Sequence, residues 1–143
     1  MSNKKIVQKI VLGGVIVKDG KVLILQRNKK EDIYPNIWEL PSGKREFLEP
    51  SEISLIREIK EETGLDVEII MPFSIFDYQI KREGEIHDCT QINFLVKPVG
   101  KSKVILSPEH QNFAWIGKDE VNTYNLTIST KKVIKKALEF FLK

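Results

Sequence analysis

The chain of 143 residues lacks a second cysteine, a long apolar run and a strong excess of either charge. Because Cys89 stands alone, no intrachain disulfide can form, which is typical of a reducing cytoplasm. The apolar run near the N-terminus is interrupted by Gln8 and Lys9, and no stretch is long enough to span a bilayer. The formal net charge of +3 does not favour nucleic-acid binding, and it suits an anionic small molecule as well as no anionic ligand at all. We therefore expect a cytoplasmic protein without a membrane or nucleic-acid partner.

The pattern of apolar residues predicts a single α/β domain over residues 1–143. Asp19-Gly20 separates the apolar runs at 10–17 and 22–25, which predicts a β-hairpin. Further strands are expected at 38–40, at 67–80 with an interruption at Pro72, at 90–96 and at 113–116, with loops at 28–36, 81–88 and 107–112. Strands and helices alternate irregularly, so we expect a mixed β-sheet covered by helices.

Two helices are predicted. The first, over residues 51–63, should begin near Pro50 or Ser51, since proline is favoured in a first turn and serine is a good cap. It should end at Gly64, because glycine adopts the left-handed conformation of a helix C-terminus. Its expected core face comprises Ile53, Ile56 and Ile59. The second helix, over residues 129–142, carries apolar residues at helical spacing and should pack on the sheet.

Five carboxylates crowd around the first helix: Glu49, Glu52, Glu58, Glu61 and Glu62. At roughly 100° per residue, Glu58, Glu61 and Glu62 fall within an arc of about 100°. Like charges placed so closely repel one another, and the hard cations Mg²⁺ and Mn²⁺ prefer carboxylate oxygens. Glu49, near the helix start, can be explained by the helix dipole alone. A glutamate-rich helix face is also commonly a solvated surface, so the charges by themselves leave both interpretations open.

The segment from Gly43 to Leu65 supplies the deciding pattern. Gly43 is followed after five residues by Glu49, and seven further residues lead to the run R-E-I-K-E-E-T-G-L that starts at Arg57. This segment resembles the Nudix box, G-x5-E-x7-R-E-U-x-E-E-x-G-U with U an aliphatic residue, at every fixed position. The chain is therefore identified as a member of the Nudix hydrolase family. The resemblance implies an α/β/α sandwich in which the box forms a loop, a helix and a second loop.

The resemblance also implies roles for the box residues. Glu58, Glu61 and Glu62 match the metal ligands of the family, and the backbone near Gly43 would add a carbonyl oxygen. Mg²⁺ is the expected cofactor, with Mn²⁺ as a substitute. Arg57 would hold a box glutamate in position, although a solvated surface arginine explains the same residue. The expected catalytic residues are Arg57, Glu58, Glu61 and Glu109.

Two flanking segments extend the resemblance to the MutT-like subgroup. Residues 23–27 read L-I-L-Q-R and precede W-E-L-P at 38–41, which makes Arg27 the counterpart of an arginine that contacts substrate phosphate. A surface salt bridge is an equal explanation for this arginine. The segment P-E-H-Q that follows Ser107 resembles a loop carrying an extra acid, so Glu109 is a candidate metal ligand or general base. His110 is expected to be structural or exposed.

The implied reaction is hydrolysis of a pyrophosphate bond in a nucleoside diphosphate linked to another moiety. The downstream proline and tyrosine markers of ADP-ribose and dinucleoside polyphosphate hydrolases are missing at their expected spacing, which favours a nucleoside triphosphate giving a nucleoside monophosphate and pyrophosphate. A nucleotide-sugar or ADP-ribose pyrophosphatase and a non-catalytic nucleotide-sensing module remain alternatives. Tyr124-Asn125 is a candidate base contact, and packing explains Tyr124 equally well. The sequence does not distinguish a monomer from a homodimer.

Overall fold

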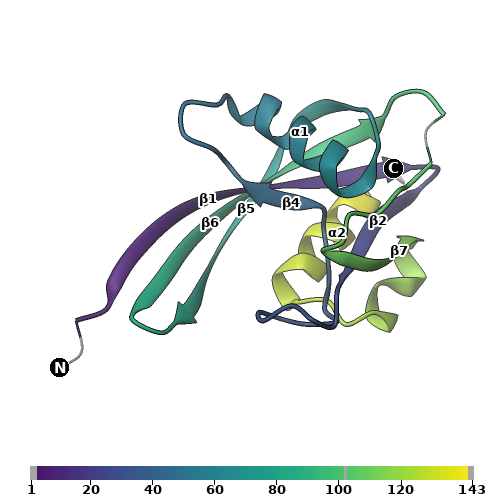
Figure 1. Ribbon diagram of the computed structural model, residues 1–143. Helices are drawn as coiled ribbons and strands as arrows, with labels where there is room; N and C mark the ends of the chain where they lie inside the picture. Colours follow the sequence, from purple (N-terminus) through teal and green to yellow (C-terminus); the bar gives the residue numbers. More distant parts are fainter. Residues whose placement is uncertain (1–2, 102, 142–143) are drawn as a thin grey trace.

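The computed structural model describes residues 3–101 and 103–141, which form a curved sheet between two helices (Figure 1). In chain order the elements are β1 (Lys5–Lys18), β2 (Lys21–Arg27), β3 (Trp38–Glu39), β4 (Ser42–Lys44), α1 (Ser51–Thr63), β5 (Val67–Arg82), β6 (Glu85–Pro98), β7 (His110–Ile116), a 3₁₀-helix (Lys118–Thr123) and α2 (Ile128–Phe141). Neither α1 nor α2 is long and apolar enough to cross a membrane. The end of the predicted second helix, Leu142, lies outside the described residues.

The sheet is mixed, as the sequence predicts. Its main strand order is β3-β2-β1-β6-β5, with β4 paired to β1 and β7 paired to β2. Only β1 and β6 run parallel, and the other strand pairs are antiparallel. Beyond the helices, β1, β5 and β6 continue as a curved three-stranded arm, formed by residues 5–10, 76–82 and 85–91 (Figure 1). This arm becomes one wall of the candidate site.

The first hairpin has the geometry that its sequence predicts. Asp19 and Gly20 connect β1 to β2, and both have positive φ angles of 51° and 74°. A two-residue turn with two positive φ angles matches the right-handed twist of the strands that it joins. The predicted strand at 38–40 is also present, as β3.

The second hairpin is longer than predicted. The charged segment at 81–88, expected to be a loop, lies in strands except for the turn at Glu83-Gly84. Pro72 does not interrupt β5, because register shifts beside it act as bulges and an edge strand tolerates a missing N–H donor. The charged residues are compatible with a strand here because the arm extends into solvent, where one face of a sheet can remain polar.

Two short strands differ from the prediction. Ser42–Lys44, for which no strand is predicted, forms β4 and pairs with β1. The predicted loop at 107–112 already enters β7 at His110. In both places pairing with a neighbouring strand supplies hydrogen bonds that local sequence patterns do not reveal.

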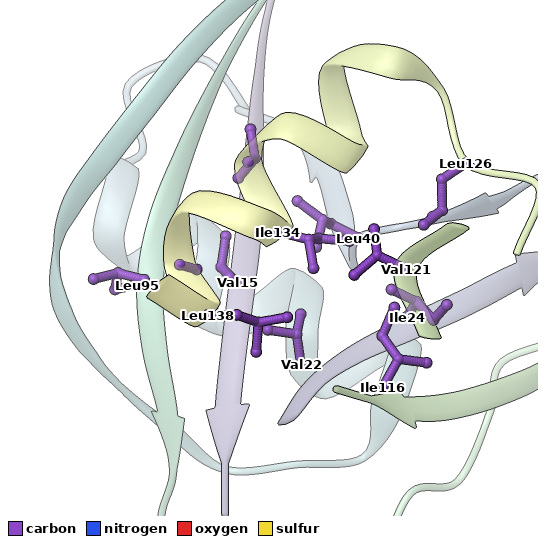
Figure 2. Packing of buried hydrophobic residues seen from close by; sticks show 12 residues of the cluster. Val15, Val22, Ile24, Leu40, Leu95, Ile116, Val121, Leu126, Ile134 and Leu138 are labelled. Carbon is purple, nitrogen blue, oxygen red and sulfur yellow. The ribbon is translucent and has the colours of Figure 1, made fainter. Parts of the chain in front are cut away.

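Helix α2 covers one face of the sheet with an apolar stripe. Ile134 and Leu138 are fully buried and lie against Val15, Val22 and Ile24 from β1 and β2 (Figure 2). The spacing of four residues between the two helical side chains places them on one face, as predicted for an amphipathic helix. Because α1 covers the opposite face, the strands at this position are buried from both sides of the sheet.

Helix α1 covers the opposite face, but only one of the three expected residues, Ile59, contributes to its buried stripe. Leu55 and Ile59 are fully buried, whereas Ile53 is 58% exposed and Ile56 is 38% exposed. The buried stripe follows the i, i+4, i+7 spacing from Leu55 through Ile59 to Glu62, so a carboxylate continues the core face. The prediction of Ile53 and Ile56 as core residues is wrong, because the helix is rotated towards its acidic side.

The ends of α1 partly match expectation. Gly64 adopts the left-handed conformation with φ 74°, as predicted, and its N–H donates to the carbonyl of Lys60. At the other end Pro50 occupies the N-cap position, and no side-chain hydrogen bond caps the helix. The predicted capping role of Ser51 is therefore wrong.

The rotation of α1 predicts that truncating two of its isoleucines lowers the free energy of unfolding by different amounts. Ile59→Ala should lower the free energy of unfolding by about 2–4 kcal/mol, because it removes buried methylenes and leaves a cavity. Ile53→Ala should change it by less than about 0.5 kcal/mol, since this side chain is mostly exposed. Urea unfolding of both variants beside the unsubstituted protein measures the difference. Equal costs would mean that α1 packs in the orientation suggested by its isoleucines.

Candidate functional site

The box helix and the short strand before it approach each other closely. Gly43 in β4 lies against the side chain of Glu58 in α1, and a Cβ atom on this glycine would overlap the carboxyl carbon of Glu58. The backbone N–H of Ser42 donates to Oε1 of Glu62 at 3.3 Å. Glycine at position 43 therefore permits this approach, because a side chain there would displace either the Glu58 carboxylate or the strand.

Arg57 holds three glutamates of the box. Its Nε and Nη2 donate to the two carboxylate oxygens of Glu49 at 3.2 and 3.0 Å, which forms a bidentate pair. Its Nη1 donates to Oε1 of Glu58 and to Oε1 of Glu61, each at 3.1 Å. The hydrogen bonds to Glu49 raise the pKa of Arg57 and lower that of Glu49. Glu49, which the sequence left explicable by the helix dipole, is the main anchor of this arginine.

Two of the box carboxylates are shielded from water. Burial raises the pKa of Glu58, against the lowering effect of the adjacent Arg57. Glu62 is only 4% exposed, and burial raises its pKa well above the usual range, with further contributions from the negative charges of Glu39 and Glu109. Within the described residues Glu62 has no basic side chain at ion-pair distance. Its charge is therefore poorly compensated by the protein itself.

The two flanking candidates lie at the same site. Arg27, at the end of β2, donates from Nε to the carbonyl of Ile33 at 2.9 Å and lies 3.5 Å from Glu39. Glu109 precedes β7, and its carbonyl accepts a hydrogen bond from Asn28 N–H at 2.9 Å, which ties its loop to the end of β2. The structure thus brings Arg27, Glu62 and Glu109 to the lining of one cavity.

This cavity has a volume of about 330 Å³ and extends from Glu62, the one box carboxylate in its lining, to the arm. Its wall includes four aromatic side chains, Tyr34, Trp38, Phe76 and Tyr78. Burial raises the pKa of the Tyr78 hydroxyl, so this side chain is neutral at physiological pH. A cavity of this size, with flat apolar walls and acidic and basic groups at one end, suits a ligand that joins a planar ring to a polyanion.

The floor of the cavity carries a polar pair from the arm and its base. Gln91 lines the cavity, and its side-chain amide donates to Oδ1 of the fully buried Asn93 at 2.8 Å. Asn93 in turn donates to the hydroxyl of Ser74 at 3.3 Å. Gly13 lies directly over this pair, and a Cβ atom at that position would overlap the Asn93 amide. The polar floor therefore depends on a glycine in the neighbouring strand.

Several lining residues were not predicted from the sequence. Glu39, Tyr78, Arg82 and Gln91 belong to strands whose pairing brings them beside the box. In the sequence, the alternation of residues along β6 is the one pattern that could have indicated these lining residues. The buried face of β6 carries, at every second position, His87, Cys89, Gln91 and Asn93. Polar residues at that period on a buried face indicate a polar cavity.

The candidate base contact at 124–125 is displaced from the cavity. Tyr124 packs edge-on against Trp38 with ring centroids 4.8 Å apart, so packing accounts for it. The next part of the chain supplies the hydroxyls of Thr127, Ser129 and Thr130 to the cavity lining. Cys89 is buried within β6.

The carboxylates suit a hard cation chemically, and Arg57 presently lies between two of them. No three acidic, histidine or cysteine side chains of the described residues converge into a metal cage as they stand. The uncompensated burial of Glu62 and the raised pKa values of Glu58 and Glu62 are nevertheless the features that a cation would relieve. The donor set is entirely oxygen, which fits Mg²⁺ or Mn²⁺.

Because the carboxylate of Glu62 is buried, we predict that removing its charge stabilises the folded protein, and that the size of this gain depends on pH. Its pKa in the folded protein is raised, so folding loses stability as the pH rises above the unfolded value near 4.5. In EDTA, Glu62→Gln should therefore raise Tm at pH 7.5 by roughly 2–5 °C, and this gain should vanish below about pH 4. Thermal unfolding of both proteins across this range measures it. A lower Tm for the variant at pH 7.5 would mean that the protein stabilises this charge.

Comparisons with known proteins agree with this geometry. The model of the NUDIX domain matches residues 9–137. A nucleoside triphosphatase NudI from Escherichia coli O139:H28 is 28% identical over 142 residues, covering 90% of this chain and 95% of that protein. The crystal structure of a MutT NUDIX hydrolase from Burkholderia pseudomallei superposes with a TM-score of 0.74 at 26% identity, covering 90% of this chain and 96% of the other. An ADP-ribose pyrophosphatase from Streptococcus suis shares the fold, with a TM-score of 0.72 at 20% identity and coverage of 94% and 92%.

The match of the family model extends over most of the chain and includes the whole segment from Gly43 to Leu65. The sheet and the two helices that cover it, of which α1 contains the box, share the fold of a solved MutT NUDIX hydrolase. The chain belongs to the Nudix hydrolase family, whose members are pyrophosphohydrolases.

Proposed function

We propose that the protein hydrolyses a nucleoside triphosphate to a nucleoside monophosphate and pyrophosphate. The observation that supports this most is one cavity whose lining combines the carboxylates of Glu62 and Glu109 with aromatic side chains. A base between aromatic walls would direct the polyphosphate towards the acidic helix. The relatives named nucleoside triphosphatase NudI support the same substrate class.

Arg27 is proposed to bind the polyphosphate. It is the one basic side chain of the cavity lining that lies beside the carboxylate end, and guanidinium matches the geometry of phosphate oxygens. Arg57 is proposed to keep Glu58 and Glu61 in place, because its Nη1 contacts both carboxylates. The two arginines would therefore serve different purposes, one for the substrate and one for the acidic helix.

The carboxylates are proposed to hold Mg²⁺, for which Mn²⁺ can substitute. The proposed ligands are Glu58, Glu61, Glu62, Glu109 and the backbone carbonyl of Gly43. A bound divalent cation neutralises phosphate oxygens and lowers the pKa of water. Glu58 and Glu109 are the candidates to accept the proton of the attacking water, and burial raises the pKa of Glu58.

The proposed roles predict a sharp contrast along α1. Glu58→Gln and Glu61→Gln should each lower kcat/KM at least about 100-fold, because each removes a charged oxygen from the reacting site. Glu52→Gln on the exposed first turn should stay within about twofold and serves as the matched control. The assay is Mg²⁺-dependent release of pyrophosphate under saturating metal. Unchanged activity in both site variants would refute these roles.

The reaction also predicts where the oxygen of water is found in the products. Water that attacks the β-phosphorus displaces the nucleoside monophosphate, so the bond from the β-phosphorus to the bridging oxygen breaks. In H₂¹⁸O the label should then enter pyrophosphate and not the monophosphate, as mass spectrometry of the separated products would show. Label in the monophosphate would mean attack at the α-phosphorus.

A substrate panel distinguishes the proposed substrate from two alternatives. Nucleoside triphosphates, ADP-ribose and nucleotide sugars are compared at equal concentration with Mg²⁺ and with Mn²⁺. Highest kcat/KM with a nucleoside triphosphate supports the proposal, and highest kcat/KM with ADP-ribose or a nucleotide sugar overturns it. Calorimetric binding of a nucleotide without hydrolysis of any compound would indicate a sensing module, against which the complete set of box acids argues.

A further inference from the structure

The end of β2 carries a buried network that neither the box nor its flanking matches explain. His110 is 5% exposed, and its Nε2 lies 2.8 Å from Oε2 of Glu39. The same oxygen of Glu39 lies 3.5 Å from Nη1 of Arg27. One carboxylate oxygen is therefore shared between a buried histidine and the proposed phosphate-binding arginine. The three residues come from three strands, β7, β3 and β2.

A β-bulge produces this arrangement. Along β2 and β7, Gln26 pairs with Asn112 but Arg27 pairs with His110, so Gln111 is an extra residue. Directly opposed residues of antiparallel strands place their side chains on the same face, so the bulge turns His110 onto the face of Arg27. The side chain of Gln111 stabilises the bulge, because its amide donates to the Arg27 carbonyl at 2.9 Å.

The state of His110 follows from its surroundings. Nδ1 is buried and has no hydrogen-bond partner among the described residues. A proton on this nitrogen would be an unsatisfied buried donor, which costs more than an unsatisfied acceptor lone pair. We therefore assign a proton to Nε2, which donates to Oε2 of Glu39 and orients this carboxylate.

Arg27 is held on several sides by this network and the preceding loop. Its Nε donates to the carbonyl of Ile33, Nη2 lies 3.7 Å from Glu31, and Nη1 faces Glu39. Its side chain is 24% exposed, towards the cavity that it lines. An arginine restrained in this way loses little rotamer freedom when it binds a phosphate, so restraint improves affinity.

We propose that His110 and Glu39 are positioning residues for Arg27. His110 fixes the carboxylate of Glu39, and Glu39 in turn holds the guanidinium in the orientation that receives the polyphosphate. The inference rests on the proposed function, because it takes Arg27 to be the phosphate-binding side chain. It assigns Glu39, which lines the cavity beside Glu62, to the support of an arginine and not to the group of metal ligands.

The test is a double-mutant cycle with the nucleoside triphosphate that is hydrolysed fastest. His110→Leu removes the donor to Glu39. It should raise KM about tenfold and leave kcat within about threefold of that of the unsubstituted protein. Arg27→Ala should raise KM about 30-fold, and the double variant should match Arg27→Ala, since His110 acts only through the arginine. His110→Gln, which restores an N–H near the position of Nε2, should recover most of the affinity.

Control variants separate a local effect from loss of a buried histidine. His87→Leu removes a second buried histidine, whose ring nitrogens have no hydrogen-bond partner among the described residues, and should leave KM unchanged. Glu39→Gln keeps an acceptor for His110 and should raise KM with little change in kcat. If His110→Leu does not fold, the double-mutant cycle combines Arg27→Ala with Glu39→Gln instead, and with His110→Gln.

Each contrary result has a distinct meaning. Multiplicative effects of His110→Leu and Arg27→Ala would overturn the inference, because the two side chains would then act independently. A fall in kcat of about 100-fold in Glu39→Gln at unchanged KM would also overturn it, since Glu39 would take part in the chemistry. If Arg27→Ala alone leaves KM unchanged, the proposed phosphate-binding role of Arg27 fails instead.

Discussion

The docking of α1 through a stripe that ends in a carboxylate is the constraint on which the site depends. Leu55 and Ile59 fix the helix to the sheet, and the next position of the same stripe is Glu62. The helix cannot bury its apolar residues without also burying this charge, which burial alone disfavours. Gly43 contributes to the constraint, because its lack of a side chain leaves room for the Glu58 carboxylate beside β4. The fold thus buries poorly compensated negative charge, which the proposed function explains by the need for oxygen ligands at a position shielded from water.

The rest of the sheet supplies what the box helix lacks. The box has acidic groups but no surface for a nucleobase, and the aromatic walls of the cavity come from the loop before β3, from β3 and from the arm. The arm exists because β5 and β6 extend past the helices, and its inner face carries Tyr78 and Gln91 towards the cavity. In the proposed function, reaction and recognition therefore reside on separate elements. Changes in the arm can alter the choice of base without moving a box glutamate.

How far the sequence predicts this site depends on whether the interactions are local. The box is one continuous segment, so its helix, its C-terminal glycine and its family follow from adjacent residues. The rotation of α1 was not predictable, because it is set by the sheet beneath and not by the positions of Ile53 and Ile56. Glu39 and His110 are far apart in sequence and meet only through strand register and a bulge. A one-residue change in register would place either side chain on the opposite face, and no local pattern specifies that choice.

The distribution of charge in the cavity couples its ligands. Glu39, Glu62 and Glu109 line it together with Arg27 and Arg82, and the negative charges of Glu39 and Glu109 already raise the pKa of Glu62. A polyphosphate would add several negative charges to this group, which a single restrained arginine at the acidic end cannot balance. Under the proposed function, polyphosphate and divalent cation must therefore each increase the affinity for the other. Glu39 adds to this imbalance, because a carboxylate beside Arg27 offsets part of the positive potential that the guanidinium offers to phosphate. Under the proposed positioning role, Glu39 contributes orientation instead, since its contact with His110 at 2.8 Å limits the carboxylate to one position beside the arginine.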